Sequence, residues 1–275
     1  MNPGSLFLLA PLLCTTVFAE RLLQARMLGG EVVQEGTFPF VASIKQIYNN
    51  LLLKSCLGSI IHDEWILSSA LCIATNDPGT IVVHLGVYSH SDQPELAYEA
   101  AEILLHPDFN STTGTPDIGL IHLETPITFT PLAQPVPLGD VPFEDVGKVV
   151  AIGWNEEPDK GLEPYHLGYI VLDTINVQAC QSAFPELDDL IHLDDAHQIC
   201  TYSGQGKDMC GVDFGGPLID QQTGRQIGVF NDVIFVVTAH SHQCHPHHDH
   251  PLVFTKVAGY MSWISEITGL ELFPL

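Results

Sequence analysis

Short runs rich in Val, Ile, Leu and aromatic residues recur along this chain, with turn residues between them. Nineteen prolines and 23 glycines punctuate the runs, and such spacing is typical of antiparallel barrels or sandwiches rather than of βαβ units. The pattern therefore predicts an all-β protein, with strands at residues 40–47, 58–67, 80–88, 118–123, 148–154, 168–177, 217–220, 226–237 and 252–257.

Three segments depart from this β pattern. The proline-rich stretch 130–142 predicts a linker that divides the chain into halves of similar size. Near the end, Val257, Tyr260, Met261 and Ile264 follow helical spacing, which predicts one C-terminal helix. At the start, an apolar run over 6–18 is too short to span a bilayer, and a small residue, Ala19, follows it. Residues 1–19 are therefore predicted to be a signal peptide, and the mature protein to be secreted without a membrane span.

The charge balance narrows the classes of partner. Lys and Arg total 9 against 33 Asp and Glu, a formal net charge of −24. Binding to DNA or to anionic membrane through phosphate or headgroup contacts needs a basic surface, so this composition argues against both. An acidic surface either keeps a secreted protein soluble or attracts a basic partner, and the sequence leaves both open.

Cysteine usage agrees with secretion. Cys14 lies in the predicted signal peptide, which leaves six cysteines in the mature chain. An even count in a secreted protein predicts three disulfides, and six cysteines allow fifteen pairings. The sequon at Asn110-Ser111-Thr112 predicts a glycosylated surface loop.

Five segments, in order along the chain, resemble those of trypsin-like serine proteases of the chymotrypsin fold. Residues 26–30 resemble the activation cleavage site, 55–72 the loop of the catalytic histidine, and 117–121 the segment of the catalytic aspartate. Residues 206–218 resemble the segment of the nucleophile, and residues 254–264 resemble the last strand and the helix that follows it. The resemblance implies two six-stranded antiparallel Greek-key barrels with a C-terminal helix. The domain would span 27–275, with the first barrel at about 27–135 and the second barrel and helix at about 136–270.

The resemblance also implies how the cysteines pair, namely Cys56–Cys72, Cys180–Cys200 and Cys210–Cys244. A further bridge of the family would join the positions that Val149 and Asp220 hold here. Both partners of that bridge are missing together, so no orphan thiol is expected.

The catalytic positions depart from the family's chemistry. Peptide hydrolysis by this route needs a hydroxyl nucleophile, an imidazole base and a carboxylate that orients the imidazole. The resemblance places Phe214 at the nucleophile, Leu71 at the base and Asp117 at the carboxylate. A phenyl ring cannot attack a carbonyl and an isobutyl group cannot accept a proton, so we expect an inactive homologue, a pseudoprotease. Of the histidines in the same half, His62, His84, His106 and His122 are candidates for a replacement base near Asp117, although none of them stands at the motif position.

The oxyanion hole and substrate pocket depart from the family pattern as well. Val212 replaces a glycine of the oxyanion hole, where a β-branched residue resists the required backbone conformation. Leu252 replaces the glycine that keeps the specificity pocket open. Asp208 matches the acidic residue that gives trypsin its preference for Arg and Lys. Because the Leu252 side chain would fill the pocket, we interpret Asp208 as an inherited residue that no longer selects substrates.

Two features of activation and one histidine cluster complete the candidate sites. Cleavage after Arg26 would remove a short propeptide, 20–26, and free the amine of Met27 to pair with Asp213. This pair could act as an activation switch, or the residues could be inherited without a regulatory use, and the sequence does not choose between the two. The cluster comprises His240, His242, His245, His247, His248 and His250. It could bind Zn²⁺ or Cu²⁺ weakly, but its spacing fits no structural zinc motif, and we favour adventitious metal or none. No cofactor is expected.

We interpret the chain as a secreted, catalytically inactive protease homologue that acts as a non-catalytic binding or regulatory protein. Its partner would be an extracellular protein, and the acidic surface would suit a basic one. The alternatives are a hydrolase with a relocated active site and extracellular metal binding through the histidine loop.

Overall fold

A computed structural model describes most of the chain. The described residues are 30–75, 77–89, 94, 96–139, 147–154, 166–184, 192–202, 209, 213–231 and 251–272. Most of the secondary structure in these residues is β-strand. The strands are β1 Glu31–Val32, β2 Val41–Tyr48, β3 Leu51–Ile60, β4 Trp65–Ser68, β5 Ile81–Leu85, β6 Leu96–Leu105, β7 Gly119–Leu123, β8 Lys148–Trp154, β9 Leu167–Ile175, β10 Gln198–Tyr202, β11 Pro217–Asp220, β12 Gln226–Phe230 and β13 Leu252–Lys256.

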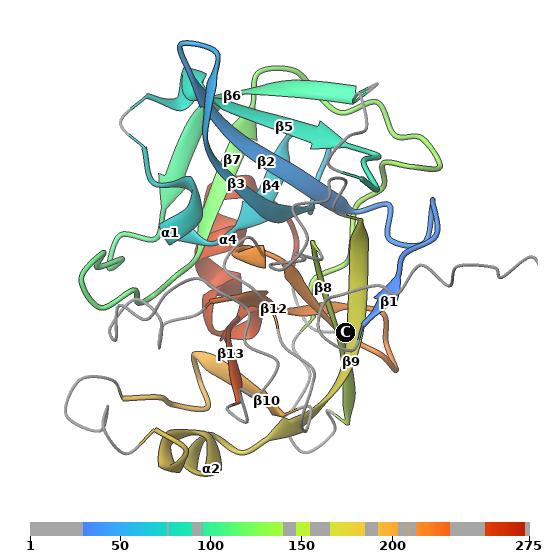
Figure 1. Cartoon of the computed structure of the whole chain (residues 1–275). Helices are drawn as coiled ribbons and strands as arrows, with labels where there is room; N and C mark the ends of the chain where they lie inside the picture. Colours follow the sequence, from blue (N-terminus) through green and yellow to red (C-terminus); the bar gives the residue numbers. More distant parts are fainter. Residues whose placement is uncertain are drawn as a thin grey trace, which may run out of the picture.

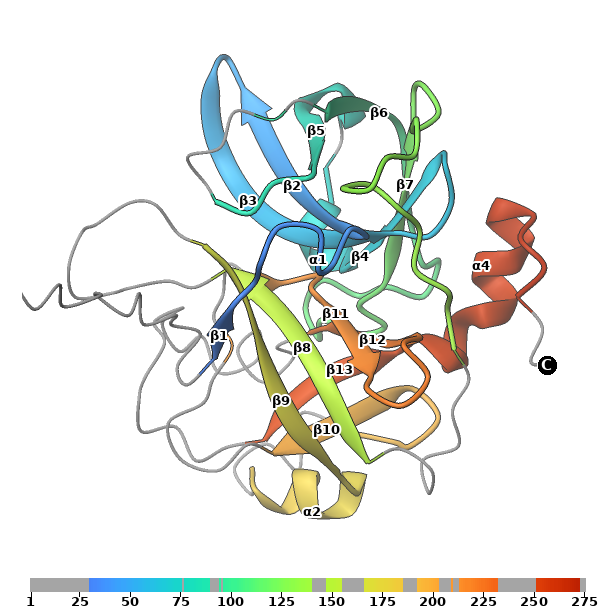
Figure 2. The same ribbon diagram turned by 90° about the vertical axis from the view of Figure 1, so that its right-hand side faces the viewer.

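The strands close into two antiparallel barrels, as the resemblance implies (Figure 1). The first barrel has the strand order β2-β3-β4-β7-β6-β5. The second runs β9-β10-β13-β12-β11-β8 and closes through the pairing of β8 with β9, while β1 adds to the edge of β9. Figure 2 shows the first barrel above the second, with the C-terminal helix beside both.

Alternating side chains place the core inside each barrel. In β2, Ala42 and Ile44 are almost fully buried and face the interior, as the period of two requires. Strand β8 is buried from Val149 to Trp154 because one face packs inside the second barrel and the other against the first. Leu57 belongs to the cluster between the barrels, together with Trp154.

The helices of the described residues are short, and two of them are capped by polar side chains. The helices are α1 (Ala70–Ile73), α2 (Val177–Ser182) and α4 (Met261–Thr268), with 3₁₀ turns at Pro78–Thr80 and Val257–Tyr260. Ser69 caps α1 and Asn176 caps α2, and α4 ends at Gly269 in the left-handed conformation. None of the helices described is long and apolar enough to cross a membrane.

Several boundaries predicted from the sequence were wrong. The predicted strand 58–67 is two strands, β3 and β4, because residues 61–64 form bends. The predicted strand 168–177 runs beyond β9 into the start of α2. Strands β6 and β10 were not predicted at all. The C-terminal helix is confirmed, and the helical spacing from Val257 continues a 3₁₀ turn into α4.

Candidate functional site

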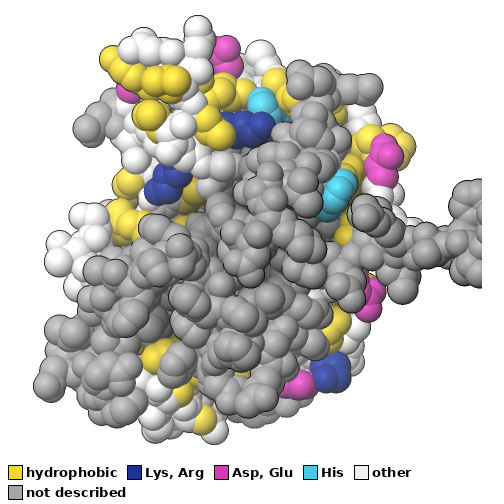
Figure 3. All heavy atoms as spheres, in the orientation of Figure 1, with side chains coloured by type: hydrophobic (Ala, Val, Ile, Leu, Met, Phe, Trp, Pro, Cys, Tyr) yellow, Lys and Arg dark blue, Asp and Glu magenta, His cyan; other side chains and the backbone are white. Residues whose placement is uncertain are grey.

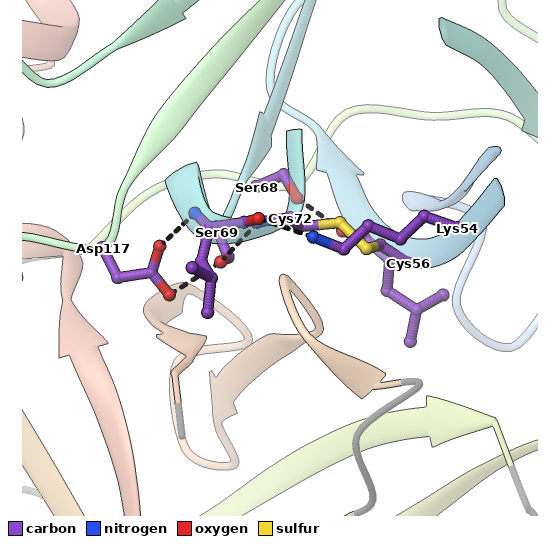
Figure 4. Close-up of a disulfide and its surroundings, with 8 residues drawn as sticks. Lys54, Cys56, Ser68, Ser69, Cys72 and Asp117 are labelled. Atoms are coloured by element: carbon purple, nitrogen blue, oxygen red, sulfur yellow. Dashed lines mark hydrogen bonds between the residues drawn. A yellow bond between two sulfur atoms is a disulfide. The ribbon is translucent and has the colours of Figure 1, made fainter. Parts of the chain in front are cut away.

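Asp117 lies directly before β7 and points at the turn that carries α1 (Figure 4). The Ser69 hydroxyl donates a hydrogen bond to Asp117 Oδ2 over 2.7 Å, and the Leu71 backbone N–H donates to Oδ1 over 2.6 Å. Ser69 Oγ also accepts from the N–H of Cys72. The carboxylate of Asp117 therefore holds the first turn of α1 in place.

Burial governs the ionisation of this carboxylate. Asp117 is fully buried. Removal from water raises the pKa of Asp117 to about 6, against the hydrogen bonds from Leu71 and Ser69 and the charge of Lys54, all of which favour the ionised form. The hydrogen-bond donors therefore hold the carboxylate in place, but its ionised form remains less favourable in the protein interior than in water.

Lys54 reaches the same turn from β3. Its ammonium donates a hydrogen bond to the Leu71 carbonyl oxygen over 2.6 Å. Burial lowers the pKa of Lys54, while the nearby Asp117 charge acts in the opposite direction. The half-buried Leu71 thus has a backbone N–H bound to Asp117 and a carbonyl bound to Lys54.

The backbone of Phe214 is fixed against the first barrel. Its carbonyl oxygen accepts from the N–H of Leu57 over 2.9 Å, and the next residue, Gly215, donates to the Phe230 carbonyl. A Cβ on Gly215 would lie 2.1 Å from the Leu57 carbonyl oxygen, and its φ is +83°. Only glycine fits there, so this close approach between the barrels requires Gly215.

The Phe214 ring is buried in an apolar cluster, where its described aromatic neighbours belong to the second barrel. It is 4% exposed and stacks on Phe230 with ring centroids 5.8 Å apart and planes 17° apart. Phe230 in turn contacts Phe254. Met209 belongs to the same cluster and Leu252 packs against it. The described side chains around Phe214 therefore offer a closed apolar packing rather than a polar site.

Comparison with known proteins decides the family. The solved structure of HL collagenase superposes with a TM-score of 0.72 at 24% identity, covering 89% of this chain and 99% of that one, a likeness that concerns the fold alone. The family model described as Trypsin matches residues 27–264. The chain belongs to the trypsin family.

Two proteins of known name are similar to this chain over most of its length. Chymotrypsin-2 of Vespa crabro is 30% identical over 244 residues, which are 87% of this chain and 99% of that protein. Mannan-binding lectin serine protease 1 of Rattus norvegicus is 26% identical over 264 residues, covering 90% of this chain and 36% of that protein.

Two disulfides that the trypsin resemblance implies are present in the described residues. Cys56 is joined to Cys72, which ties β3 to α1, and Cys180 is joined to Cys200, which ties α2 to β10. Cys210 and Cys244 lie outside the described residues. Val149 and Asp220 face each other in register between β8 and β11, which is the arrangement expected where the family has a further bridge.

Asp213 is fully buried at the position where a trypsin-type activation switch would need it. Its Oδ1 accepts a hydrogen bond from the Trp154 backbone N–H. Gly153 permits this approach, because a Cβ there would lie 2.5 Å from the Asp213 carboxyl carbon. Arg26 and Met27 lie outside the described residues, so their pairing with Asp213 stays a prediction.

The four histidines considered as replacement bases contact other groups. His62 lies beside Asp63, His122 stacks on Trp65, and His106 packs against Tyr260 and Trp263. His84 pairs in register with Ser43, and its pKa is lowered to about 4 by burial and then by the charge of Lys45. Among the described residues, the hydrogen bonds of the Asp117 carboxylate come from Ser69 and from the backbone of α1.

Several other sequence-predicted site residues are placed only in part. Asn110 lies in an exposed turn, where its side-chain oxygen accepts from the Thr112 N–H, and its glycosylation stays a prediction. The signal peptide, the propeptide, Asp208, Val212 and the whole histidine cluster from His240 to His250 lie outside the described residues.

The residues that contact Asp117, Leu71 and Phe214 were not identified from the sequence. Ser69 precedes the helix with the spacing of an N-cap, which is a readable signal. Lys54 and Phe230 carry no comparable signal, because only the closed barrel brings them to Leu71 and Phe214.

Proposed function

We propose that this trypsin-family chain is a secreted, catalytically inactive homologue that acts as a non-catalytic binding or regulatory protein. The observation that carries the proposal is the packing at Phe214. By the family resemblance this residue stands where the nucleophile would be, and its ring is buried against Phe230. Phenylalanine supplies no hydroxyl there, and with only 4% of Phe214 exposed its ring offers little surface on which a substrate could bind.

The surroundings of Leu71 support the same proposal. The Asp117 oxygens that would orient an imidazole are bound by Ser69 and by the Leu71 N–H itself. A general base must reach the proton it accepts, and Leu71 has no atom that can accept one. The surviving carboxylate acts here as a structural anchor for α1.

Secretion is part of this proposal. The two disulfides of the described residues suit an oxidising compartment. The predicted signal peptide agrees with this, and N-terminal sequencing of the secreted protein tests it. We expect the mature chain to begin at Glu20, or at Met27 if cleavage follows Arg26.

An activity assay tests the catalytic half of the proposal. Purified protein, cleaved and uncleaved after Arg26, is incubated with chromogenic Arg and Lys substrates, labelled casein and a fluorophosphonate probe. We expect no turnover above the buffer control and no covalent labelling of either form. Trypsin serves as the positive control.

Asp117→Asn is the matched variant for this assay. Inhibitor-sensitive turnover that copurifies with the wild-type chain and disappears in Asp117→Asn would overturn the proposal. Turnover that is equal in both proteins would come from a contaminant or from a site remote from Asp117, and labelling of the intact chain by the probe separates these two cases.

Capture experiments test the binding half. The mature chain, cleaved and uncleaved, is used as bait in the fluid that bathes the secreting tissue, with low-salt and high-salt washes. A stoichiometric partner released by salt would match the acidic surface, because screening weakens such contacts. Empty captures on both baits would contradict a binding role for a protein partner.

A further inference from the structure

The hairpin between β2 and β3 exposes a concentrated apolar surface. Tyr48 is 55% exposed, Leu51 66%, Leu52 54% and Leu53 59%. These four are the majority of the seven large hydrophobic side chains that are exposed in the described chain. Scattered exposed apolar residues are ordinary, whereas a contiguous group marks an interaction site. We call residues 48–53 the hairpin tip.

Strand pairing shows that the hairpin tip projects from the barrel. β2 pairs with β5 only from Ala42 to Gln46, but with β3 as far as Tyr48 opposite Leu51. On its other side β3 pairs with β4 only from Gly58 onward. The tip is therefore the end of a two-stranded ribbon, which rises above the first barrel in Figure 2.

The turn of the hairpin tip is built to be rigid. Asn49 and Asn50 both have positive φ, 50° and 61°, as the two central residues of a type I′ turn require. Asn tolerates this conformation better than other residues with a Cβ. The apolar side chains are thus presented in a fixed arrangement without an ordering cost at the turn.

Both faces of the ribbon are apolar at the tip. Tyr48 pairs with Leu51 and Ile47 with Leu52. Because successive side chains of a strand point to opposite faces, Tyr48 and Leu51 lie on one face of the ribbon and Leu52 on the other. Leu53 is the extra residue of a bulge between these pairs and the pairing of Gln46 with Lys54. Tyr48 and the three leucines are each more than half exposed. A protein surface that docks on a ribbon covers one of its faces, whereas a lipid phase surrounds both, and a tyrosine suits the boundary between lipid and water.

The charges near the hairpin tip permit this contact but do not select anionic lipid. Residues 36–62 contain no Asp or Glu, and Lys45 and Lys54 are their only charged residues. Lys54 donates to the Leu71 carbonyl and so points back toward the barrel. Figure 3 shows hydrophobic side chains at this end of the first barrel, with acidic side chains next to them and basic side chains on the barrel beneath. The net charge of −24 opposes the approach to an anionic surface.

We propose that the hairpin tip is a lipid-docking site that inserts into the interface of a neutral, phosphatidylcholine bilayer. This deepens the proposed binding role by naming the partner of one surface, and it does not depend on the state of the catalytic positions. The contact is peripheral, since a short ribbon reaches the headgroup and upper acyl region and no farther.

Vesicle sedimentation tests the proposal with the full mature chain. The probe is phosphatidylcholine vesicles, alone or with added phosphatidylserine, at low salt. We expect binding to phosphatidylcholine and weaker binding once phosphatidylserine is present. The variant Leu51→Ser/Leu52→Ser/Leu53→Ser should bind at least about tenfold more weakly, because it removes most of the inserted apolar surface.

Two controls keep the result specific. Phe129→Ser removes an exposed aromatic side chain elsewhere on the first barrel and should leave vesicle binding unchanged. Tyr48→Trp should show a blue-shifted tryptophan emission with vesicles and quenching by brominated phosphatidylcholine. Equal melting temperatures of the variants establish that they are folded.

Three outcomes would overturn the lipid-docking proposal. They are no sedimentation of the wild type, equal sedimentation of the triple variant, and an unchanged emission of Tyr48→Trp. Absence of vesicle binding combined with salt-resistant capture of a protein by the same tip would assign the tip to a protein groove instead. None of these results affects the peptidase assay, so the two proposals fail separately.

Discussion

Single residues at the positions that match the catalytic residues of the trypsin family have structural roles. Asp117 is a buried carboxylate whose oxygens are bound by the Ser69 hydroxyl and the Leu71 N–H. Its backbone carbonyl also accepts from Thr255 of the second barrel over 2.9 Å. Asp117 therefore links α1, β7 and β13. These contacts stabilise the fold, whereas ionisation of the buried carboxyl group destabilises it.

The pH dependence of stability should reveal this destabilisation. Burial raises the pKa of Asp117 to about 6, from 3.8 in the unfolded chain. Its contribution to stability is therefore complete below pH 4 and is lost as pH rises through 6. In Asp117→Asn the side chain stays neutral at every pH. We therefore expect the free energy of unfolding of the variant, relative to that of the wild type, to increase by roughly 2–3 kcal/mol between pH 4 and 7.

Denaturant unfolding at a series of pH values measures this difference. The amide of the variant keeps an acceptor for the Leu71 N–H and can donate to Ser69 Oγ, so the hydrogen bonds are retained. A constant difference between the two proteins across this range would contradict the pKa shift. A variant that is less stable at pH 7 would show that the ionised carboxylate stabilises the fold.

Phe214 should behave as a core residue. We expect Phe214→Ala to lower the free energy of unfolding by about 3–5 kcal/mol, as for other buried phenylalanines. The exposed Phe129→Ala serves as the control and should change it by less than about 0.5 kcal/mol. A loss below about 1 kcal/mol at Phe214 would mean that its ring does not fill the cluster with Phe230.

Restoring the catalytic side chains alone should not restore catalysis. We expect Leu71→His/Phe214→Ser to be less stable than the wild type and to show no turnover of Arg or Lys substrates. Val212 and Leu252 still depart from the family pattern in that variant, and the serine leaves a gap beside Phe230. Measurable turnover of the double variant would show that the rest of the site is intact.

At the scale of elements, two disulfides hold the short helices. α1 is tied to β3 through Cys56–Cys72, and α2 to β10 through Cys180–Cys200. A helix of four to six residues is not stable alone. The bridges and the caps at Ser69 and Asn176 therefore compensate for the small apolar area that each helix buries.

Removal of the second bridge is the direct test. We expect Cys180→Ala/Cys200→Ala to lose about 2–4 kcal/mol of unfolding free energy, since a crosslink over 20 residues restricts the unfolded chain. Denaturant unfolding measures the loss, and the wild type under reducing conditions is the comparison. Unchanged stability would contradict this assignment.

The elements also show which parts of the fold are readable from sequence. Strands β8 and β11 have the bounds that the pattern predicts, because their Val and Ile runs are flanked by turn residues. β6 was missed because its Ala-Glu-Leu composition favours a helix, and pairing with β5 and β7 overrides that preference. The site could be predicted at Asp117 and Phe214, whereas the contacts of Lys54 and Phe230 depend on barrel closure.

For the whole molecule, the dominant property is its net charge of −24. Like charges repel within the compact state, and salt screens that repulsion. We expect the melting temperature to rise by at least a few degrees between low and physiological ionic strength. Scanning calorimetry in chloride salts measures the rise, and a flat or falling profile would show that local ion pairs such as Lys148–Asp173 outweigh the repulsion.

The projecting ribbon also affects how the molecule meets its own copies. Past Gln46 on β2 and over residues 51–53 of β3, the described strands pair only with each other. Their outer edges therefore present free backbone donors and acceptors next to apolar side chains, the geometry by which one sheet extends another. At high protein concentration, the ribbon is therefore the place where strand addition between two copies would begin.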